Sequence, residues 1–571
     1  MQANLIETIR ASVIGDAETV RGPYGLRRVT YADYTASGRA LGFIEDYIRQ
    51  VVLPLYANTH TESSGTGRQT SAFREEARRI IGEAVGAVSE EHAVVFCGSG
   101  STGAINRMIE VLNLRIPANL DDRYGFTRQV PPQQRPVVFI GPYEHHSNEL
   151  PWRESIADVV VIPEDADGHI DIASLEAELL RHGERQLKIG SFSAASNVTG
   201  IITDHRAIAR LLHRHGALSF WDFAAAAPYV SIEMGRRLGA EAGYLDAIFL
   251  SPHKFIGGPG TPGVLVARRE LFTNRVPSVP GGGTVAFVNP GEHRYLADIE
   301  AREEGGTPAI IESIRAGLVF QLKEDVGVEQ IRRLEEGFTG RAIARWQQNS
   351  NIEILGNPDN DRLSIVSFVV RHQGRYLHHN FVVALLNDLF GIQSRGGCSC
   401  AGPYGHRLLG IDVETSHEFD REISRGCEAI KPGWVRVNFN YFISDEVFEF
   451  ILRAVDFVAT EGWRLLPDYT LDLTTGRWRH VGDQVQPALS LREIQYSAAA
   501  AAPPSGRPLA SEDALEVYLA EARRIVESPH HHPVVVADDV SADFEHLRWF
   551  WLPGDALLGP SVSAGVAGRL S

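Results

Sequence analysis

The first 300 residues alternate short apolar runs with longer amphipathic stretches, and this alternation limits the fold more than any other feature. Runs such as "AVVFC", "RPVVFIG" and "DAIFLS" have the length and composition of buried strands. Stretches such as "DIASLEAELLRHG" and "DHRAIARLLHRHG" follow such runs with a helical period. Strands that alternate with helices on this scale predict an α/β domain with a mostly parallel sheet. Ligands of such sheets bind at the loops after the carboxyl ends of the strands.

The pattern changes near residue 310. Residues 311–349 have the periodicity of one long helix, and "LSIVSFVV", "FVVALLNDLFG" and "WVRVNFNYF" predict strand, helix and strand. We therefore expect four parts: an N-terminal segment of the small domain (1–30), a large domain (31–310), a smaller α+β domain (311–465) and a C-terminal extension (466–571). An Ala/Pro-rich stretch at 497–513 is typical of a linker inside that extension.

The charge and the cysteine content exclude several classes of protein. The 571 residues include 72 acidic and 55 basic side chains, which gives a formal net charge of −17. This surplus disfavours binding to nucleic acid or to anionic membranes, so we expect neither as a partner. Four cysteines are too few for a disulfide framework, and no apolar run is long enough to span a bilayer. The N-terminus lacks the apolar region of a signal peptide, and we expect the protein in the cytoplasm.

Four polar segments follow predicted strands, and each has both a chemical and a structural interpretation. In "SPHKFIGGPG", Lys254 can form a Schiff base with an aldehyde cofactor, or it can be a surface lysine in a Gly/Pro turn. In "CGSGSTGAIN", backbone N–H groups and hydroxyls at a helix start can bind phosphate, or they can form a plain turn.

The other two segments carry an aspartate and a histidine. Asp222 in "WDFAAAAPY" can pair with a protonated pyridine nitrogen, or it can cap a helix. In "GPYEHHSNELPW", His145 or His146 can lie flat on an aromatic ring, or it can be an ordinary turn histidine. Each segment alone favours the structural interpretation, but their joint order along the chain is far more specific.

In that order, the segments resemble the fold-type I, class V aminotransferase-like family, which uses pyridoxal 5'-phosphate. Within it they are most similar to the cysteine desulfurase and selenocysteine lyase branch. The resemblance covers residues 28–460 and includes "SPHK", "STGAIN", "EHHSN", "ASNVTG", "REEGGTPAI" and "WVRVNFNYF". It implies a fold-type I transferase with a large, mostly parallel-sheet domain and a smaller α+β domain. It also implies an amino acid as the substrate.

The resemblance assigns roles to individual residues. Lys254 would be the Schiff-base lysine, His145 would stack on the cofactor ring, and Thr307 would reach the phosphate of a partner subunit, which implies a homodimer. The implied cofactor-binding residues are Ser101, Thr102, His145, Asn197, Asp222, Ser251, His253, Lys254 and Thr307. The implied substrate-binding residues are Arg395, Arg436 and His60. At position 225, where relatives carry Gln or His beside the ring hydroxyl, this chain has Ala225.

The segment "SRGGCSCAGPYGH" holds two of the four cysteines, Cys398 and Cys400. By itself it can be a metal clip, a disulfide, a reactive thiol on a glycine-rich loop or a tight turn. The desulfurase branch carries Arg-Xaa-Gly-His-His-Cys-Ala here, and superposing the arginines sets Cys400 on the nucleophile and Arg395 near the substrate carboxylate. Molybdenum cofactor sulfurases have a similar Arg-Thr-Gly-Cys-Phe-Cys loop. We expect no metal, because no further ligand has metal-site spacing nearby; the role of Cys398 stays open.

The resemblance implies an enzyme that converts L-cysteine to alanine and a persulfide on Cys400, with Lys254, Cys400 and His145 as catalytic residues. A sulfur-acceptor protein would then be a partner. Two alternatives remain from the sequence: another class V reaction, by an aminotransferase, epimerase or lyase on a different amino acid, and a noncatalytic relative that binds a partner.

Overall fold

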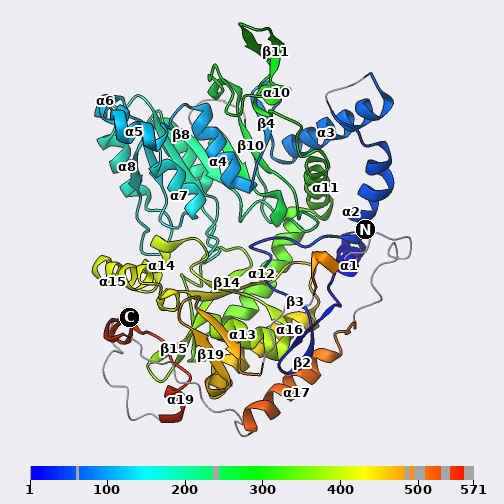
Figure 1. Cartoon of the computed structure of the whole chain (residues 1–571), viewed down its shortest axis with the longest axis vertical. Coiled ribbons are helices and arrows are strands. Elements are labelled where there is room, and N and C mark those ends of the chain that lie inside the picture. The colour runs from blue at the N-terminus through cyan, green and yellow to red at the C-terminus, as the bar shows by residue number, and fades with distance from the viewer. Residues whose placement is uncertain are drawn as a thin grey trace. The chain divides into compact units, whose positions relative to one another are not determined.

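The computed structural model describes residues 2–59, 63–235, 243–482, 489–493, 508–528 and 541–558 (Figure 1). These residues form two compact units. Unit 1 comprises Met1–Ile14, Tyr34–Glu336 and Asp359–Leu363, and unit 2 comprises Gly15–Asp33, Gly337–Pro358 and Ser364–Ser571. The four-part division predicted from the sequence stays a prediction, and of its linker only residues 508–513 are described.

A seven-stranded sheet forms the centre of unit 1, in the order β4-β10-β9-β8-β7-β5-β6. The strands are β4 (His92–Cys97), β5 (Val137–Ile140), β6 (Asp158–Val161), β7 (Lys188–Ser193), β8 (Leu218–Asp222), β9 (Ala247–Leu250) and β10 (Gly263–Arg268). Strand β10 runs antiparallel to both of its neighbours, whereas the pairs from β9 to β6 are parallel. The predicted mostly parallel sheet is therefore confirmed.

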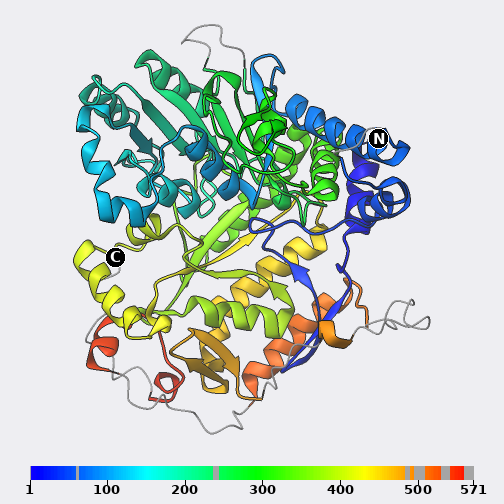
Figure 2. The ribbon, with the colours of Figure 1, turned by 45° about the horizontal axis from the view of Figure 1, so that its top comes forward.

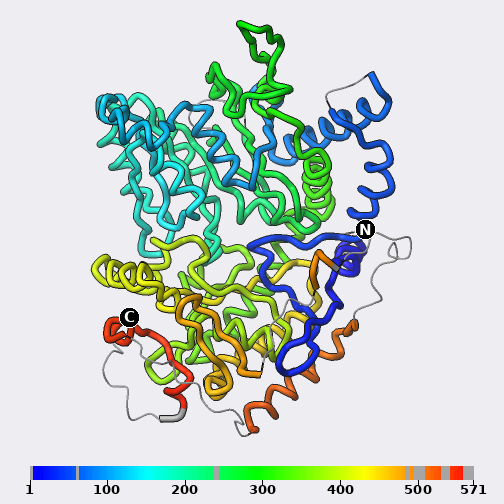
Figure 3. The backbone as a smooth tube through the Cα atoms, viewed as in Figure 1, coloured from blue at the N-terminus to red at the C-terminus, as the bar shows by residue number. Residues whose placement is uncertain are grey.

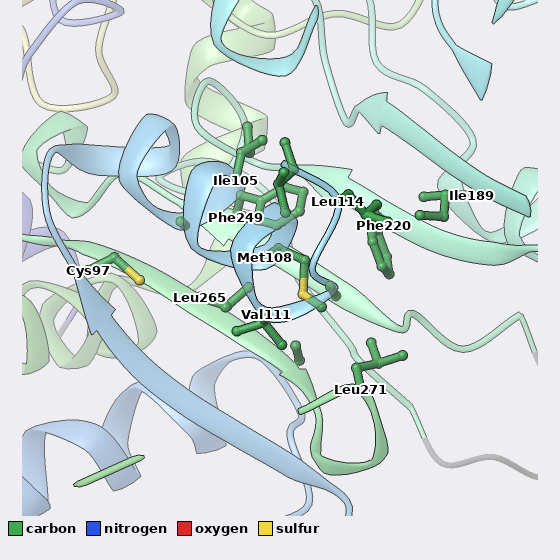
Figure 4. Close-up of a cluster of buried hydrophobic side chains, with 14 of the residues drawn as sticks. Cys97, Ile105, Met108, Val111, Leu114, Ile189, Phe220, Phe249, Leu265 and Leu271 are labelled. Carbon is green, nitrogen blue, oxygen red and sulfur yellow. The ribbon is translucent and has the colours of Figure 1, made fainter. Parts of the chain in front are cut away.

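Helices that begin after the strands pack on this sheet. They include α4 (Gly100–Val111), α7 (His146–Arg153), α8 (Ile172–Arg181) and α9 (His205–Arg214). Asp171 and Asp204 cap α8 and α9 by accepting backbone N–H groups of the first turn. Figure 4 shows Ile105, Met108 and Val111 of α4 facing Phe249 and Leu265 of the sheet. Each such buried side chain contributes about 1.5–3 kcal/mol, so α4 is held firmly over the ends of β4, β9 and β10.

The long helix predicted for residues 311–349 is wrong in one respect. The structure has two helices there, α11 (Ile310–Val326) and α12 (Val328–Trp346), separated by Gly327. Gly327 has φ +85° and ψ 126°, a conformation that only glycine adopts readily. The apolar period continues across this residue, which is why the sequence pattern does not reveal the break.

Unit 2 is built on a five-stranded sheet whose strand pairs are all antiparallel. The strands are β13 (Ile352–Ile354), β14 (Ile365–His372), β15 (Arg375–Leu377), β17 (Arg395–Gly397) and β18 (Trp434–Asn438). Its main helices are α13 (His379–Phe390), α15 (Val413–Ser424) and α16 (Asp445–Glu461). The strand, helix and strand predicted after residue 360 are therefore confirmed as β14, α13 and β18.

Both ends of the chain contribute to unit 2. The hairpin of β1 (Thr19–Gly22) and β2 (Gly25–Arg28), blue in Figures 2 and 3, lies beside the orange helix α17 (Ala514–Glu527). Arg27 forms an ion pair with Glu521 at 3.0 Å, and its guanidinium lies over the Tyr518 ring. A second hairpin, β19 (Tyr469–Asp472) and β20 (Arg477–His480), packs on α13. The extension is thus part of the core of unit 2.

In the part of the chain that the structure describes, no helix combines the length and apolar character needed to span a bilayer.

Candidate active site

The predicted cofactor-binding residues of unit 1 lie on loops that follow strands at one edge of the sheet. The loop after β4 leads into α4, the loop after β5 into α7, and β8 ends at Asp222. The turn after β9 carries Ser251, His253 and Lys254. Because these strands run in the same direction, their carboxyl ends bring the loops together, as expected for a ligand site of an α/β sheet.

The turn at the start of α4 is tightly packed against the turn after β9. Gly100 has φ +53°, and a Cβ at this position would lie 2.7 Å from Ser251 Oγ. Ser101 N donates to Ser251 Oγ at 2.8 Å, and Ser251 Oγ lies 3.1 Å from Ser101 Oγ. A helix N-terminus with two hydroxyls beside it suits the binding of a phosphate group.

His145 and Thr102 are connected to each other through Ser147. His145 caps α7, because its Nδ1 accepts from Ser147 N at 3.1 Å. The Ser147 hydroxyl lies 2.7 Å from Thr102 Oγ1. With Nδ1 as an acceptor, this hydrogen-bond network assigns the proton of a neutral ring to Nε2. The predicted ring-stacking histidine and the predicted phosphate turn therefore belong to one hydrogen-bonded group.

Asp222 is a buried carboxylate at the end of β8, with 5% of its surface exposed. Burial raises its pKa, while the backbone N–H of Ala224, the charge of Lys254 and the Ser101 hydroxyl oppose the rise. Asp222, Lys254 and Ser101 thus lie close enough to interact. A buried carboxylate of this kind is complementary to a protonated ring nitrogen.

The backbone at His253 is clamped by residues 37 and 38. The His253 carbonyl accepts from Gly38 N at 2.8 Å and from Ser37 Oγ at 3.2 Å. A Cβ at Gly38 would lie 1.9 Å from Phe255 O, so only glycine fits. Burial, and then the charge of Lys254, lower the pKa of His253 to about 4. The imidazole is therefore neutral near pH 7, and Lys254 is presented from a rigid turn.

Three further predicted binding residues are Asn197, Thr307 and His60. Asn197 is buried in the loop after β7. Thr307 is exposed, and its Oγ1 accepts from Asn58 Nδ2 at 3.2 Å. His60 lies outside the described residues.

Glu144 is a buried residue of this edge to which sequence reasoning gave no role. Its carboxylate accepts from Gly141 N, Ser193 N, Ser193 Oγ and Asn148 Nδ2 at 2.7–3.1 Å. Burial raises its pKa to about 7 against these hydrogen bonds, and the nearby Asp222 adds to the rise. Through these hydrogen bonds Glu144 connects the loop after β5 to the end of β7. In the sequence, Glu144 could have been singled out by its position directly before His145.

The predicted substrate-binding arginines lie side by side in unit 2. Arg395 of β17 and Arg436 of β18 are direct cross-strand partners. Arg436 is 3% exposed and donates from Nη2 to Asp33 Oδ1 at 2.9 Å, and Arg395 Nη1 lies 3.7 Å from Asp33 Oδ2. Burial lowers the pKa of Arg436, and Asp33 counteracts this effect. Two guanidiniums share one carboxylate, so a positive charge remains for a second anion. Asp33 was not predicted from the sequence.

The cysteine loop follows β17 directly. Gly397 has φ +117°, and Ser399 and Cys400 have φ +51° and +56°, which residues with a Cβ adopt only when their surroundings hold them. Cys398 and Cys400 are exposed free thiols, and Cys400 lies close enough to Arg436 that a thiolate there would raise the pKa of the arginine. Within the described ranges, no group of three or more His, Cys, Asp or Glu is placed to hold a metal ion.

Comparison with known proteins gives one family and a consistent set of relatives. The profile of the family described as "Aminotransferase class-V" matches residues 30–415. A "Probable cysteine desulfurase" of Staphylococcus aureus is 28% identical over 385 residues, which cover 66% of this chain and 84% of that relative. A "Probable cysteine desulfurase" of Halalkalibacterium halodurans is 28% identical over 364 residues, 63% of this chain and 80% of that relative.

Solved structures show the same fold. The apo structure of cysteine desulfurase from Thermococcus onnurineus NA1 matches with a TM-score of 0.60 and 23% identity, covering 76% of this chain and 94% of that chain. The cysteine desulfurase CsdA from Escherichia coli, in an S-sulfonic acid form, matches with a TM-score of 0.59 and 20% identity, covering 79% and 97%. The α/β architecture predicted from the sequence, fold type I, is confirmed.

Proposed function

Because the chain belongs to the aminotransferase class V family, we propose that it is a cysteine desulfurase that releases alanine from L-cysteine and retains the sulfur on Cys400. Enzymes of this family use pyridoxal phosphate, and the chain is related to cysteine desulfurases. The relatives that suggest L-cysteine as the substrate are 28% identical to this chain.

The side chains of unit 1 fit pyridoxal phosphate. The turn of Gly100 and Ser101 has the N–H and hydroxyl donors that a phosphate needs, and it has no room for a Cβ at residue 100. Asp222 is a buried carboxylate that would be stabilised by a protonated ring nitrogen. Lys254 lies within the electrostatic reach of Asp222, as an amine that holds the cofactor aldehyde must.

When bound, pyridoxal phosphate serves as an electron sink for negative charge at the substrate Cα. Lys254 would take the Cα proton and later return it. His145, fixed by its bond from Ser147 N, would hold the ring against tilting. His253 stays neutral near pH 7, so it adds no competing positive charge beside the amine.

The residues of unit 2 would bind the substrate carboxylate and receive the sulfur. Arg436 and Arg395 would bind the carboxylate, since Asp33 neutralises only one of them. The Cys400 thiolate would attack the substrate sulfur: the bond between the two sulfur atoms forms, and the bond between substrate Cβ and sulfur breaks. The electron pair of the broken bond remains on the carbon and takes up a proton. Alanine and a Cys400 persulfide result, so atoms and electrons balance.

The observation that carries this proposal is an exposed thiol on a loop with two non-glycine residues at positive φ, directly after the strand that pairs Arg395 with Arg436. A transaminase or an epimerase needs no thiol there. Backbone strain of this kind is typical of functional sites.

A single-turnover experiment tests the proposal. Holoenzyme is mixed with one equivalent of L-cysteine, alanine is quantified, and the peptide around residue 400 is analysed by fragmentation mass spectrometry. Wild type and Cys398→Ser should form one alanine and carry one additional sulfur on Cys400, whereas Cys400→Ala should form no alanine. Equal alanine formation by Cys400→Ala would refute the persulfide step.

The main alternative is another class V reaction on a different amino acid, and Ala225 is the observation in its favour. This buried alanine has no side chain that can hydrogen-bond a cofactor hydroxyl. Incubation with a panel of amino acids distinguishes the two, because a transaminase yields a keto acid and an epimerase a D-amino acid, whereas a desulfurase yields alanine and, when a thiol reductant is added, sulfide.

We also propose that the protein is a cytoplasmic homodimer that passes its sulfur to an acceptor protein. Phe43, Tyr47, Val51 and Leu55 recur every four residues in unit 1 and are 37–44% exposed, which is the pattern of a face that a second copy covers. Thr307 is exposed, as a residue that reaches a partner subunit must be. All four cysteines are free thiols, in keeping with a reducing compartment. Light scattering of wild type and Tyr47→Glu tests the dimer: the variant should be monomeric.

A further inference from the structure

The segment around Trp549 lies beyond residue 415, where the family match ends, but it pairs with strand β15 of the sheet that carries the cysteine loop. Tyr376 N donates to Trp549 O at 3.2 Å, and Trp551 N donates to Tyr376 O at 3.1 Å, which pairs the segment with β15. The Trp549 indole donates from Nε1 to Ile430 O at 3.1 Å, and the side chain is 9% exposed. The segment is therefore firmly anchored in unit 2.

Trp549 stacks on two buried histidines at the start of α13. Its ring is nearly parallel to that of His379, at 5.9 Å and 11°, and to that of His378, at 5.5 Å and 19°. His378 is also held by polar contacts, with Asn380 N at Nδ1 and Ala429 O at Nε2, both at 3.1 Å. Among the described residues, Nδ1 of His379 has no hydrogen-bond partner. The position of the His379 ring thus depends on packing.

The His379 ring in turn lies against the backbone from which the cysteine loop starts. A Cβ at Gly433 would lie 2.8 Å from His379 Cε1 and 2.8 Å from Gly397 Cα, and a Cβ at Gly396 would lie 3.2 Å from His379 Cδ2. Glycines at these positions allow the ring to touch the main chain directly. Gly397 is followed immediately by Cys398, so a shift of the ring moves the loop.

A second contact reaches the same strand from the β19–β20 hairpin of the extension. Asn380 Nδ2 donates to Gly476 O at 2.8 Å, in the turn between β19 and β20, which Figure 2 shows beside α13. Asn380 Oδ1 lies 2.7 Å from where a Cβ at Gly396 would be. Trp478 of β20 lies 5.9 Å from His378. The β19–β20 hairpin and the Trp549 segment therefore both reach β17 through the first turn of α13.

Ser399 and Cys400 need such support, because positive φ disfavours residues with a Cβ. We propose that Trp549 is a positioning residue for the thiol loop, which it holds through His379 and the backbone of Gly396 and Gly397. The C-terminal extension is then a structural support that sets the reactive geometry of Cys400. The expected effect of Trp549 on catalysis rests on the function proposed above, whereas its expected effect on the conformation of the loop does not.

Two matched variants test the proposal. Trp549→Leu removes the stack on His379, and Trp463→Leu removes a comparable stack on His372, at 4.7 Å and 15°. Hydrogen exchange of residues 397–401 is measured in each holoenzyme, together with kcat and KM for alanine formation. Trp549→Leu should speed loop exchange about tenfold and lower kcat about tenfold with KM unchanged, because Arg436 on β18 keeps its ion pair with Asp33.

Trp463→Leu should leave loop exchange, kcat and KM at wild-type values. Trp549→Phe, which keeps an aromatic face on His379, should restore kcat. Equal effects of the two leucine variants on the loop, or no effect of either, would overturn the proposal. If Trp549→Leu does not fold, Asn380→Ala is measured instead, and unchanged loop exchange in it would overturn the proposal too. If wild type forms no alanine but the exchange difference persists, the function is wrong and the positioning role stands.

Discussion

Replacing Gly100 by alanine is the sharpest test of the phosphate turn. The residue has φ +53°, where an alanine is disfavoured by about 1–2 kcal/mol. The added Cβ would also lie 2.7 Å from Ser251 Oγ and displace this hydroxyl from Ser101 N, a hydrogen bond worth about 1 kcal/mol. The holoenzyme should therefore lose about 2–3 kcal/mol relative to the unfolded chain and free cofactor.

This loss lowers the stability of the apoprotein, its affinity for the cofactor, or both. The division depends on whether the turn changes its shape when no cofactor is bound. If the turn keeps its shape without cofactor, the free energy of unfolding of the apoprotein falls by the whole amount and the affinity for pyridoxal phosphate is unchanged. If the turn relaxes, apo stability is preserved and affinity falls by about 30–150-fold, at 1.4 kcal/mol per tenfold. The sum of the two losses is fixed by the thermodynamic cycle, so both must be measured.

The assay combines urea unfolding of the apoprotein with titration of pyridoxal phosphate followed by absorbance. Gly98→Ala is the matched control, since it lies in the same turn and a Cβ there meets nothing within 4 Å. This variant should behave as wild type in both measurements. A Gly100→Ala protein with wild-type stability and wild-type affinity would refute the assignment of this turn to the phosphate.

Three further substitutions test other parts of the structure. Asp33→Asn leaves the buried Arg436 guanidinium without this carboxylate, so the free energy of unfolding in low-salt urea should fall by about 3 kcal/mol. Added sulfate should restore more stability to this variant than it adds to wild type. An unchanged urea midpoint would contradict this account. His378→Asn removes a ring whose burial lowers its pKa to about 3. Because the unfolded chain protonates this ring below about pH 6.5 while the folded protein keeps it neutral, wild-type stability falls as pH drops from 6.5 toward 3, by up to about 1.4 kcal/mol per unit. The variant should show a shallower slope in urea titrations at several pH values, and identical slopes would exclude a neutral buried His378. Gly327→Ala forces a residue with a Cβ into φ +85° and should lower the free energy of unfolding by about 1–3 kcal/mol in thermal melts. Gly337→Ala on α12 is the control, because a Cβ at Gly337 meets nothing within 4 Å. Equal melting temperatures for the two variants would contradict the helix break.

The large sheet was predictable because most of its strands are buried on both faces. The runs "AVVFC", "RPVVFIG" and "DAIFLS" are strands β4, β5 and β9, because a strand that is buried on both faces is a continuous apolar run that can be recognised without its partner. The break at Gly327 was not predictable, because a single backbone dihedral leaves the hydrophobic period unchanged. Residues at strand ends, such as Asp222 and Lys254, could be proposed because a parallel sheet gathers those ends at one edge.

Residues that act through tertiary pairing could not be read from the sequence. Asp33 lies 403 residues before Arg436, and neither carries a local signal that the two pair. The same holds for Trp549, which reaches the cysteine loop only through His379. A resemblance transfers roles at matched positions, so it proposes Cys400 as the reacting thiol but does not reveal the contacts that hold the thiol in place. In this chain those contacts come from a segment beyond the family match. We therefore expect substitution of Trp549 to change the conformation of the thiol loop while every residue inside the family match stays the same.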